Sequence, residues 1–130
     1  MRREPAVPSD PPFSPTQNER WYLRVTADWA ARLRRGEPVG PKPSLTQRDL
    51  AFARQVLGLR PGTRVLETGC GWGRCTVELI RMGCRVTAVD LSPAMVALTR
   101  ERLDEARLTA DVRVATVRLL PSFQEPFDAV

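Results

Sequence analysis

A cluster of glycines that follows an acidic residue is the segment of the sequence best suited to bind a ligand. Gly69, Gly71 and Gly73 lie within five residues, shortly after Glu67. A backbone without Cβ atoms can turn sharply and approach a ligand closely. The pattern predicts a strand before these glycines and a helix after them, and open α/β sheets bind their ligands at this end of a strand. We therefore expect a ligand-binding loop here.

Asp90 is the second candidate, because it ends the next predicted strand, 23 residues after Glu67. A carboxylate at that position can accept hydrogen bonds from both hydroxyls of a ribose. Alternatively, Asp90 is an ordinary acidic residue before the helix start at Ser92 and Pro93, where it interacts favourably with the helix dipole. Its combination with the glycine loop favours the site of an adenosine-containing cofactor.

Two classes of such cofactor bind at a glycine loop of this kind. A dinucleotide prefers the spacing G-x-G-x-x-G, but the position of the third glycine is occupied by Arg74. The carboxylate of Glu67 would also repel a pyrophosphate, whereas it suits a ligand with an ammonium and a sulfonium group. The sequence thus favours S-adenosylmethionine, and a fragment of an NAD(P)-dependent oxidoreductase is the alternative.

These segments resemble those of a known family. Residues 65–73 and 86–95 are similar to motif I and the following acidic motif of class I S-adenosylmethionine-dependent methyltransferases, and 127–130 resembles the start of their fourth strand. The resemblance covers about residues 46–130. It implies an α/β fold with a Rossmann-like, mostly parallel sheet and flanking helices. It also implies that the chain is truncated after the start of strand 4, because family members continue for several more strands.

The resemblance also assigns roles to residues. It implies that the acidic residue and the glycines of the loop line the methionine part of the cofactor, that Asp90 binds the ribose, and that Leu91 and Met95 flank the adenine. The predicted cofactor-binding residues are Glu67, Gly69, Cys70, Gly71, Asp90, Leu91 and Met95. Many family members also have an Asp after the third strand, near the adenine amino group. Residues 115–120 contain no carboxylate, so this contact is not expected in the usual form.

The function implied is methyl transfer to a small-molecule acceptor. Residues that position the acceptor usually follow the fourth strand in this family, so no catalytic residue is predicted in this chain. A non-catalytic remnant that binds the cofactor is the alternative for the chain as it stands.

The N-terminal part is expected to contain two helices before the sheet. A helix over about 17–35 is predicted from the apolar residues Trp21, Val25, Trp29 and Leu33, which recur every four positions. We interpret this stripe as a packing surface, and a lid over a bound ligand is the alternative. A second helix is expected to be capped by Ser44 or Thr46 and to end at Gly58. Its inner face is expected to consist of Leu50, Ala53 and Leu57.

The rest of the chain alternates strands and helices, which predicts a parallel sheet. Strands are expected at 64–67, 85–89, 111–118 and 127–130, with a helix at 73–82 and another that begins at Ser92. The second of these helices is expected to pack on the sheet through Met95, Leu98, Leu103 and Ala106. We expect a disordered Pro-rich lead at 1–15, an N-terminal helix and linker at 16–45, and a partial methyltransferase domain at 46–130.

Composition limits the other possibilities. The net charge is +5, but nineteen of the twenty basic residues are dispersed arginines, so we expect no nucleic-acid partner. Three cysteines without a C-x-x-C pair and the absence of His predict neither a metal site nor a disulfide framework. No apolar run suggests a signal peptide or a membrane span, and a cytoplasmic location is expected.

Overall fold

The computed structural model describes residues 13–40 and 42–130. Its centre is a parallel sheet in the order β1-β2-β3, formed by β1 (Arg64–Thr68), β2 (Arg85–Asp90) and β3 (Asp111–Val114). Val65 pairs with Val86, and Thr87 pairs with Asp111. The expected Rossmann-like fold with a parallel sheet is therefore confirmed. Most of the predicted lead at 1–15 lies outside the described residues.

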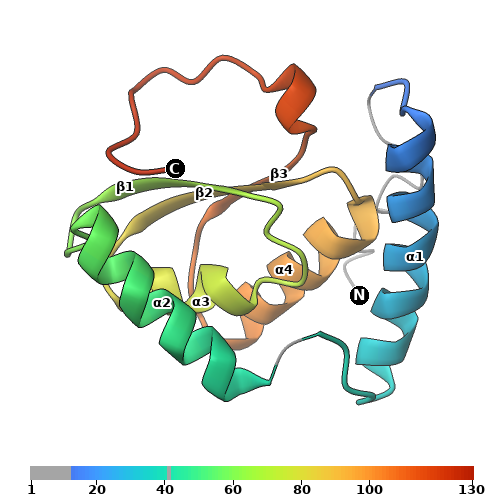
Figure 1. The fold of residues 1–130 in the computed structure, drawn as a ribbon, viewed down its shortest axis with the longest axis horizontal. Helices are drawn as coiled ribbons and strands as arrows, with labels where there is room; N and C mark the ends of the chain where they lie inside the picture. Colours follow the sequence, from blue (N-terminus) through green and yellow to red (C-terminus); the bar gives the residue numbers. More distant parts are fainter. Residues whose placement is uncertain (1–12, 41) are drawn as a thin grey trace, which may run out of the picture.

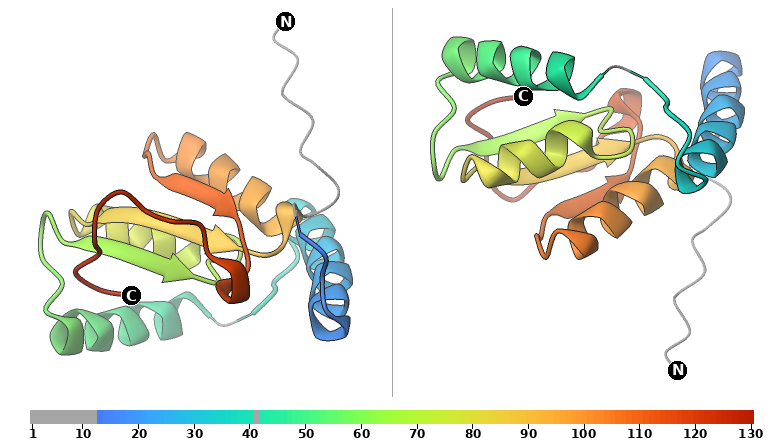
Figure 2. Two further views of the ribbon diagram at one scale, coloured as in Figure 1. Left: turned by 90° about the horizontal axis from the view of Figure 1, so that it is seen from above. Right: turned by 90° about the horizontal axis from the view of Figure 1, so that it is seen from below.

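The helices are arranged around this sheet in two ways (Figure 1). α2 (Pro43–Leu57), α3 (Arg74–Arg81) and α4 (Pro93–Glu105) lie side by side on one face, as Figure 2 shows from below. α1 (Gln17–Arg34) instead stands at the end of the sheet toward which the strand arrows point. α1 therefore lies across the carboxyl ends of the strands, where ligands bind in open α/β sheets.

The alternation of side chains along β1 and β2 divides the core between the two faces of the sheet. The main cluster lies on the side of α3 and α4 and includes Val65, Val86, Ala88, Val96 and Leu103. The other face carries Leu66, Val89 and Ala115, which are covered by Phe123 and Phe127 from the segment after β3. This segment returns to the free edge of β1, where Ala129 forms a parallel bridge with Val65. Of the strand predicted at 127–130, this single bridge is the part that the structure shows.

Local chemistry explains where the helices start and end. Thr16 and Glu19 form a reciprocal capping box at the start of α1. The Ser92 hydroxyl accepts a hydrogen bond from Met95 N–H at the start of α4, with Pro93 in the first turn, as the sequence predicts. α2 ends at Gly58 in the left-handed conformation, which also agrees with the sequence.

Three local predictions are wrong. α2 begins at Pro43 after Lys42, without the side-chain cap expected from Ser44 or Thr46, because Pro43 is itself suited to the first helical position. Leu57 is exposed and does not belong to the inner face of α2. The third strand ends at Val114 and not at 118, because β2 has no residue beyond Asp90 to pair with it. The chain instead forms the 3-10 helix η1 (Val117–Leu119).

We predict that Leu103→Ala lowers the free energy of unfolding by about 2–5 kcal/mol, because it leaves a cavity between α4 and the sheet. Leu103 is 3% exposed and belongs to the main cluster. The matched control is Leu119→Ala, since Leu119 is 56% exposed and should change stability by no more than about 0.5 kcal/mol. Urea denaturation of both variants measures this difference, and equal losses would contradict the assigned core.

Candidate functional site

The glycine loop between β1 and α3 is open toward solvent. Gly69 and Gly71 have φ values of +69° and +57°, and no atom lies within 4 Å of where a Cβ on either would stand. A side chain at these positions would be strained and would fill the space beside the loop. Gly73 differs, because a Cβ there would stand 3.0 Å from the Thr99 side chain. The first two glycines keep a ligand space open, and the third allows close packing on α4.

Asp90 is the centre of the polar contacts at the end of β2. It is 2% exposed, and its two carboxylate oxygens accept hydrogen bonds from Ser92 N–H (2.8 Å, to Oδ1) and Gly71 N–H (2.9 Å, to Oδ2). Burial raises the pKa of Asp90, and the hydrogen bonds that it accepts oppose this shift. Asp90 therefore joins the glycine loop to the start of α4.

A third donor to Asp90 comes from α1. The Tyr22 hydroxyl donates a hydrogen bond to Asp90 Oδ2 over 3.1 Å. Burial raises the pKa of Tyr22, and the Asp90 charge adds to this effect, so the hydroxyl keeps its proton. Tyr22 is not among the predicted site residues, because the apolar pattern of this helix points to the stripe that contains Trp21, which is 57% exposed. The spacing of Tyr22, Thr26 and Ala30 was the available signal.

Glu67 is a partly buried residue whose carboxylate has an incomplete set of partners. Its Oε1 accepts a hydrogen bond from the Thr76 hydroxyl, while its Oε2 is buried without any partner. Burial raises the pKa of Glu67 to about 7, an effect that the Thr76 hydrogen bond and the nearby charge of Arg74 oppose. A buried acceptor without a donor is unfavourable, so this oxygen suits a donor or a cation supplied by a ligand.

A cavity of about 160 Å³ lies beside Tyr22 and Asp90 at the carboxyl end of the sheet. Its lining comes from α1, the glycine loop, the end of β2 and the segment after β3: Tyr22, Gly69, Val89, Asp90, Leu91, Ala115, Thr116 and Val117. The predicted residues Gly69, Asp90 and Leu91 thus lie together at one space. The segment without a carboxylate, 115–117, forms its opposite wall.

Two other predicted residues, Met95 and Cys70, do not line this cavity. Met95 is fully buried in an apolar cluster with Ala30 of α1 and Leu98. The Cys70 thiol is buried next to Thr99, and burial raises its pKa to about 12, so it stays neutral and is no nucleophile. Within the part of the chain that the structure describes, no group of side chains could hold a metal ion.

A larger cavity of about 720 Å³ lies between the α1–α2 connection and the outer sides of α3 and α4. Trp72 lines it and packs against Gly40, where an added Cβ would stand 2.4 Å from the indole ring. None of the seven predicted site residues contributes to this lining. Asp90 and its hydrogen bonds to Tyr22 and Gly71 border the smaller cavity, which is therefore the candidate site; Glu67 does not line it.

The family follows from a comparison with known sequences. A family model described as a methyltransferase domain matches residues 65–130, which contain the glycine loop, Glu67 and Asp90. The chain belongs to the methyltransferase domain family. A ubiquinone biosynthesis O-methyltransferase of Xanthomonas campestris is 42% identical over 83 residues, which cover 63% of this chain and 34% of that protein. The methyltransferase chain thus spans about a third of the length of the curated relatives it matches.

Solved structures agree with the fold of this methyltransferase domain. The PH0226 protein from Pyrococcus horikoshii has a TM-score of 0.56 and 26% identity, over 62% of this chain and 34% of that chain. The magnesium protoporphyrin IX methyltransferase from Synechocystis, solved with bound SAM, has a TM-score of 0.65 over 84% of this chain and 59% of that chain. At 18% identity, this second likeness shows the fold alone. Within residues 13–40 and 42–130, no helix is long and apolar enough to cross a membrane.

We predict that Glu67 titrates near pH 7 in the folded protein. Because burial raises the pKa of Glu67 above its ordinary value of 4.5, its contribution to stability is present below about pH 4.5 and is lost as the pH rises to about 7. The free energy of unfolding of the wild type, relative to that of Glu67→Gln, should fall over this range by no more than about 3 kcal/mol.

The titration itself can be followed by the ¹³C chemical shift of the Glu67 carboxyl carbon. Thr76→Val removes the hydrogen bond that favours the ionised form, so it should move the titration to higher pH. A midpoint below pH 5 in the wild type would contradict the assigned environment.

Proposed function

We propose that this methyltransferase domain binds S-adenosylmethionine and forms the cofactor-binding part of an enzyme that methylates a small-molecule acceptor. The observation that supports this most is the pair of acidic residues, the partly buried Glu67 and the buried Asp90, that precede and follow an open glycine loop. Two acidic groups of this kind suit a ligand with a positive charge and a diol. They do not suit a ligand whose central group is an anion.

Each part of the cofactor has a matching group in the chain. The unpartnered Oε2 of Glu67 can accept a hydrogen bond from the ammonium group, and the loop at Gly69 and Gly71 leaves space beside it. Asp90 can accept hydrogen bonds from the ribose hydroxyls. Leu91 lines the cavity and offers an apolar contact to the adenine. These residues therefore fit S-adenosylmethionine, and Cys70 and Met95 would support the site from behind.

When bound, the cofactor supplies an electrophilic methyl group on a sulfonium. The described residues of the chain would hold and orient the cofactor rather than react with the acceptor. Orientation is itself a large contribution in a transfer that depends on the alignment of nucleophile and leaving group. No residue of the chain is assigned a catalytic role.

The proposal of a small-molecule acceptor is supported by the names of relatives such as the ubiquinone biosynthesis O-methyltransferase. A nucleic-acid acceptor receives less support, because part of the arginine charge within the described residues is paired. Seven arginines pair with carboxylates: Arg32, Arg34, Arg35, Arg64, Arg81, Arg113 and Arg118. A cytoplasmic location and the domain limits 1–15, 16–45 and 46–130 stay predictions from the sequence.

The alternatives are a fragment of an NAD(P)-dependent oxidoreductase and a remnant that binds the cofactor without catalysis. Calorimetric titration of the whole chain with S-adenosylhomocysteine and with NAD⁺ distinguishes the proposal from the oxidoreductase alternative. Binding of S-adenosylhomocysteine alone supports the proposal, and preferential binding of NAD⁺ would overturn it. Transfer of label from methyl-labelled S-adenosylmethionine to a panel of small phenols and amines then separates an enzyme from a remnant.

Asp90→Ala should weaken the binding of S-adenosylhomocysteine by about 1.5–3 kcal/mol for each lost hydrogen bond to the ribose. The matched control is Asp111→Ala, since Asp111 lies at the start of β3 and pairs with exposed Arg113. Calorimetry of both variants gives the difference. Equal affinity of Asp90→Ala and the wild type would remove Asp90 from the site.

Gly71→Val should abolish binding while leaving the circular dichroism spectrum largely unchanged. The branched side chain would fill the open space of the loop and would be strained at a φ of +57°. Gly62→Val is the matched control, because Gly62 has a φ of +88°, equally open surroundings and a place outside the site. Loss of binding in both variants would indicate a general effect of backbone strain instead.

A further inference from the structure

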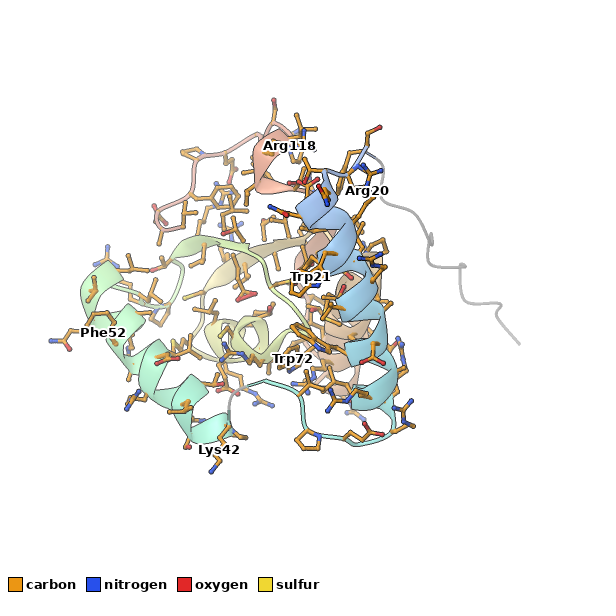
Figure 3. All side chains as sticks on the ribbon, turned by 45° about the vertical axis from the view of Figure 1, so that its right-hand side comes forward. Arg20, Trp21, Lys42, Phe52, Trp72 and Arg118 are labelled. Atoms are coloured by element: carbon orange, nitrogen blue, oxygen red, sulfur yellow. The ribbon has the colours of Figure 1, made fainter. Side chains whose placement is uncertain are left out.

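Polar contacts from three successive turns hold α1 over the ligand cavity. Glu19 accepts hydrogen bonds from the Thr116 hydroxyl (3.0 Å) and from the Arg118 guanidinium (3.3–3.4 Å). One turn later the Tyr22 hydroxyl binds Asp90 (3.1 Å), and the next turn places the Thr26 hydroxyl 2.8 Å from that of Ser92. Figure 3 shows Arg118 beside the first turn of α1. The helix thus closes the end of the cavity.

The hydrogen bonds at Asp90 leave too few acceptor positions for a ribose. An ionised carboxylate offers about four lone-pair positions. Ser92 N–H occupies one on Oδ1, while Gly71 N–H and the Tyr22 hydroxyl occupy both on Oδ2. The Leu91 N–H also favours the ionised carboxylate, so at most one position remains, whereas a ribose diol brings two donors. The two backbone donors belong to the loop and to the helix start, so Tyr22 is the donor that can leave.

The size of the cavity leads to the same conclusion. Sites for small ligands measure roughly 300–1,000 Å³, whereas this cavity measures about 160 Å³. Tyr22 forms the wall on the side of α1, and Thr116, which binds Glu19, forms part of the wall on the side of η1. The cavity can therefore enlarge when these two walls separate.

We propose that Tyr22 gates the site: its hydroxyl competes with the ribose for Asp90, and the Glu19 contacts must release before an adenosine-containing ligand can enter. This inference rests on the proposed function and adds Tyr22 and Glu19 as residues that set affinity and rate of entry. The far end of α1 stays in place during release. Ala30 packs with Met95 and Leu98 there, and Arg34 pairs with Glu101 (2.7 Å).

Binding of two related nucleosides by wild type and Tyr22→Phe tests the competition. Adenosine carries both ribose hydroxyls, and 2′,3′-dideoxyadenosine carries neither. Removing the Tyr22 hydroxyl frees a position on a charged acceptor, so Tyr22→Phe should bind adenosine about tenfold more tightly. The affinity for the dideoxy compound should stay within about twofold of the wild type. The phenyl ring preserves packing, and a thermal melt verifies that the variant is folded.

Three results would overturn the gate. An equal change for both nucleosides would mean that Tyr22 acts only on general packing. Weaker binding of adenosine by Tyr22→Phe would mean that Tyr22 helps to hold the ribose. Failure of the wild type and of every variant to bind S-adenosylhomocysteine would overturn the proposed function and the gate with it, and this outcome differs visibly from the first two.

The Glu19 contacts are tested by the rate of entry. Stopped-flow tryptophan fluorescence should show S-adenosylhomocysteine associating several-fold faster with Glu19→Gln than with the wild type. The matched control is Glu101→Gln, which breaks the ion pair at the far end of α1 and should leave the rate unchanged. Higher salt should speed entry into the wild type but not into Glu19→Gln, because the Arg118–Glu19 pair is exposed on the Arg118 side. Equal rates for the wild type and Glu19→Gln would contradict a latch at this position.

Discussion

The buried charge of Asp90 is the constraint on which the rest of the site depends. A carboxylate that leaves water loses several kcal/mol of hydration unless hydrogen bonds replace it. The replacements come from the glycine loop, the start of α4 and Tyr22 of α1. These three segments are distant in sequence, so the charge is compensated only when the sheet, the loop and α1 are assembled together. The ligand site is therefore formed only when these parts of the fold are in place.

Glu67 stands in contrast to Asp90, although both are acidic and mostly buried. One oxygen of Glu67 has a partner and the other has none, so the protein alone does not compensate its charge. Protonation is one way to relieve this, which is why the pKa of Glu67 is raised to about 7. A positively charged ligand is the other way. The protein itself thus compensates the charge of Asp90, whereas the charge of Glu67 still lacks a partner, and two acidic groups of this kind would repel a phosphate.

From β1 to the start of α4, the sequence predicts the boundaries of each strand and helix to within about one residue. These boundaries are fixed locally by glycines, by the Ser92–Pro93 helix start and by alternating apolar residues. The prediction fails where a boundary depends on a distant partner. The end of β3 is fixed by the end of β2, which no local pattern encodes. On α1, Trp29 and Leu33 of the predicted apolar stripe pack against the cluster of Met95 and Leu98, as expected of a packing surface. The part of α1 that covers the carboxylate of Asp90 instead carries the hydroxyls of Tyr22 and Thr26, which a pattern of apolar residues does not reveal.

The two ends of α1 are held by interactions that respond differently to a ligand. At the far end, Ala30 and Leu33 pack against Met95 and Leu98. Separating these apolar side chains would expose them to water and lose the whole free energy gained by their burial. At the near end, the contacts of Glu19 and Tyr22 are hydrogen bonds, which exchange for bonds to water or to a ligand with a small net change in free energy. A helix held in this way opens where the ligand enters and stays fixed where the core lies. The choice of polar groups at one end and apolar groups at the other therefore determines which end of the helix can move.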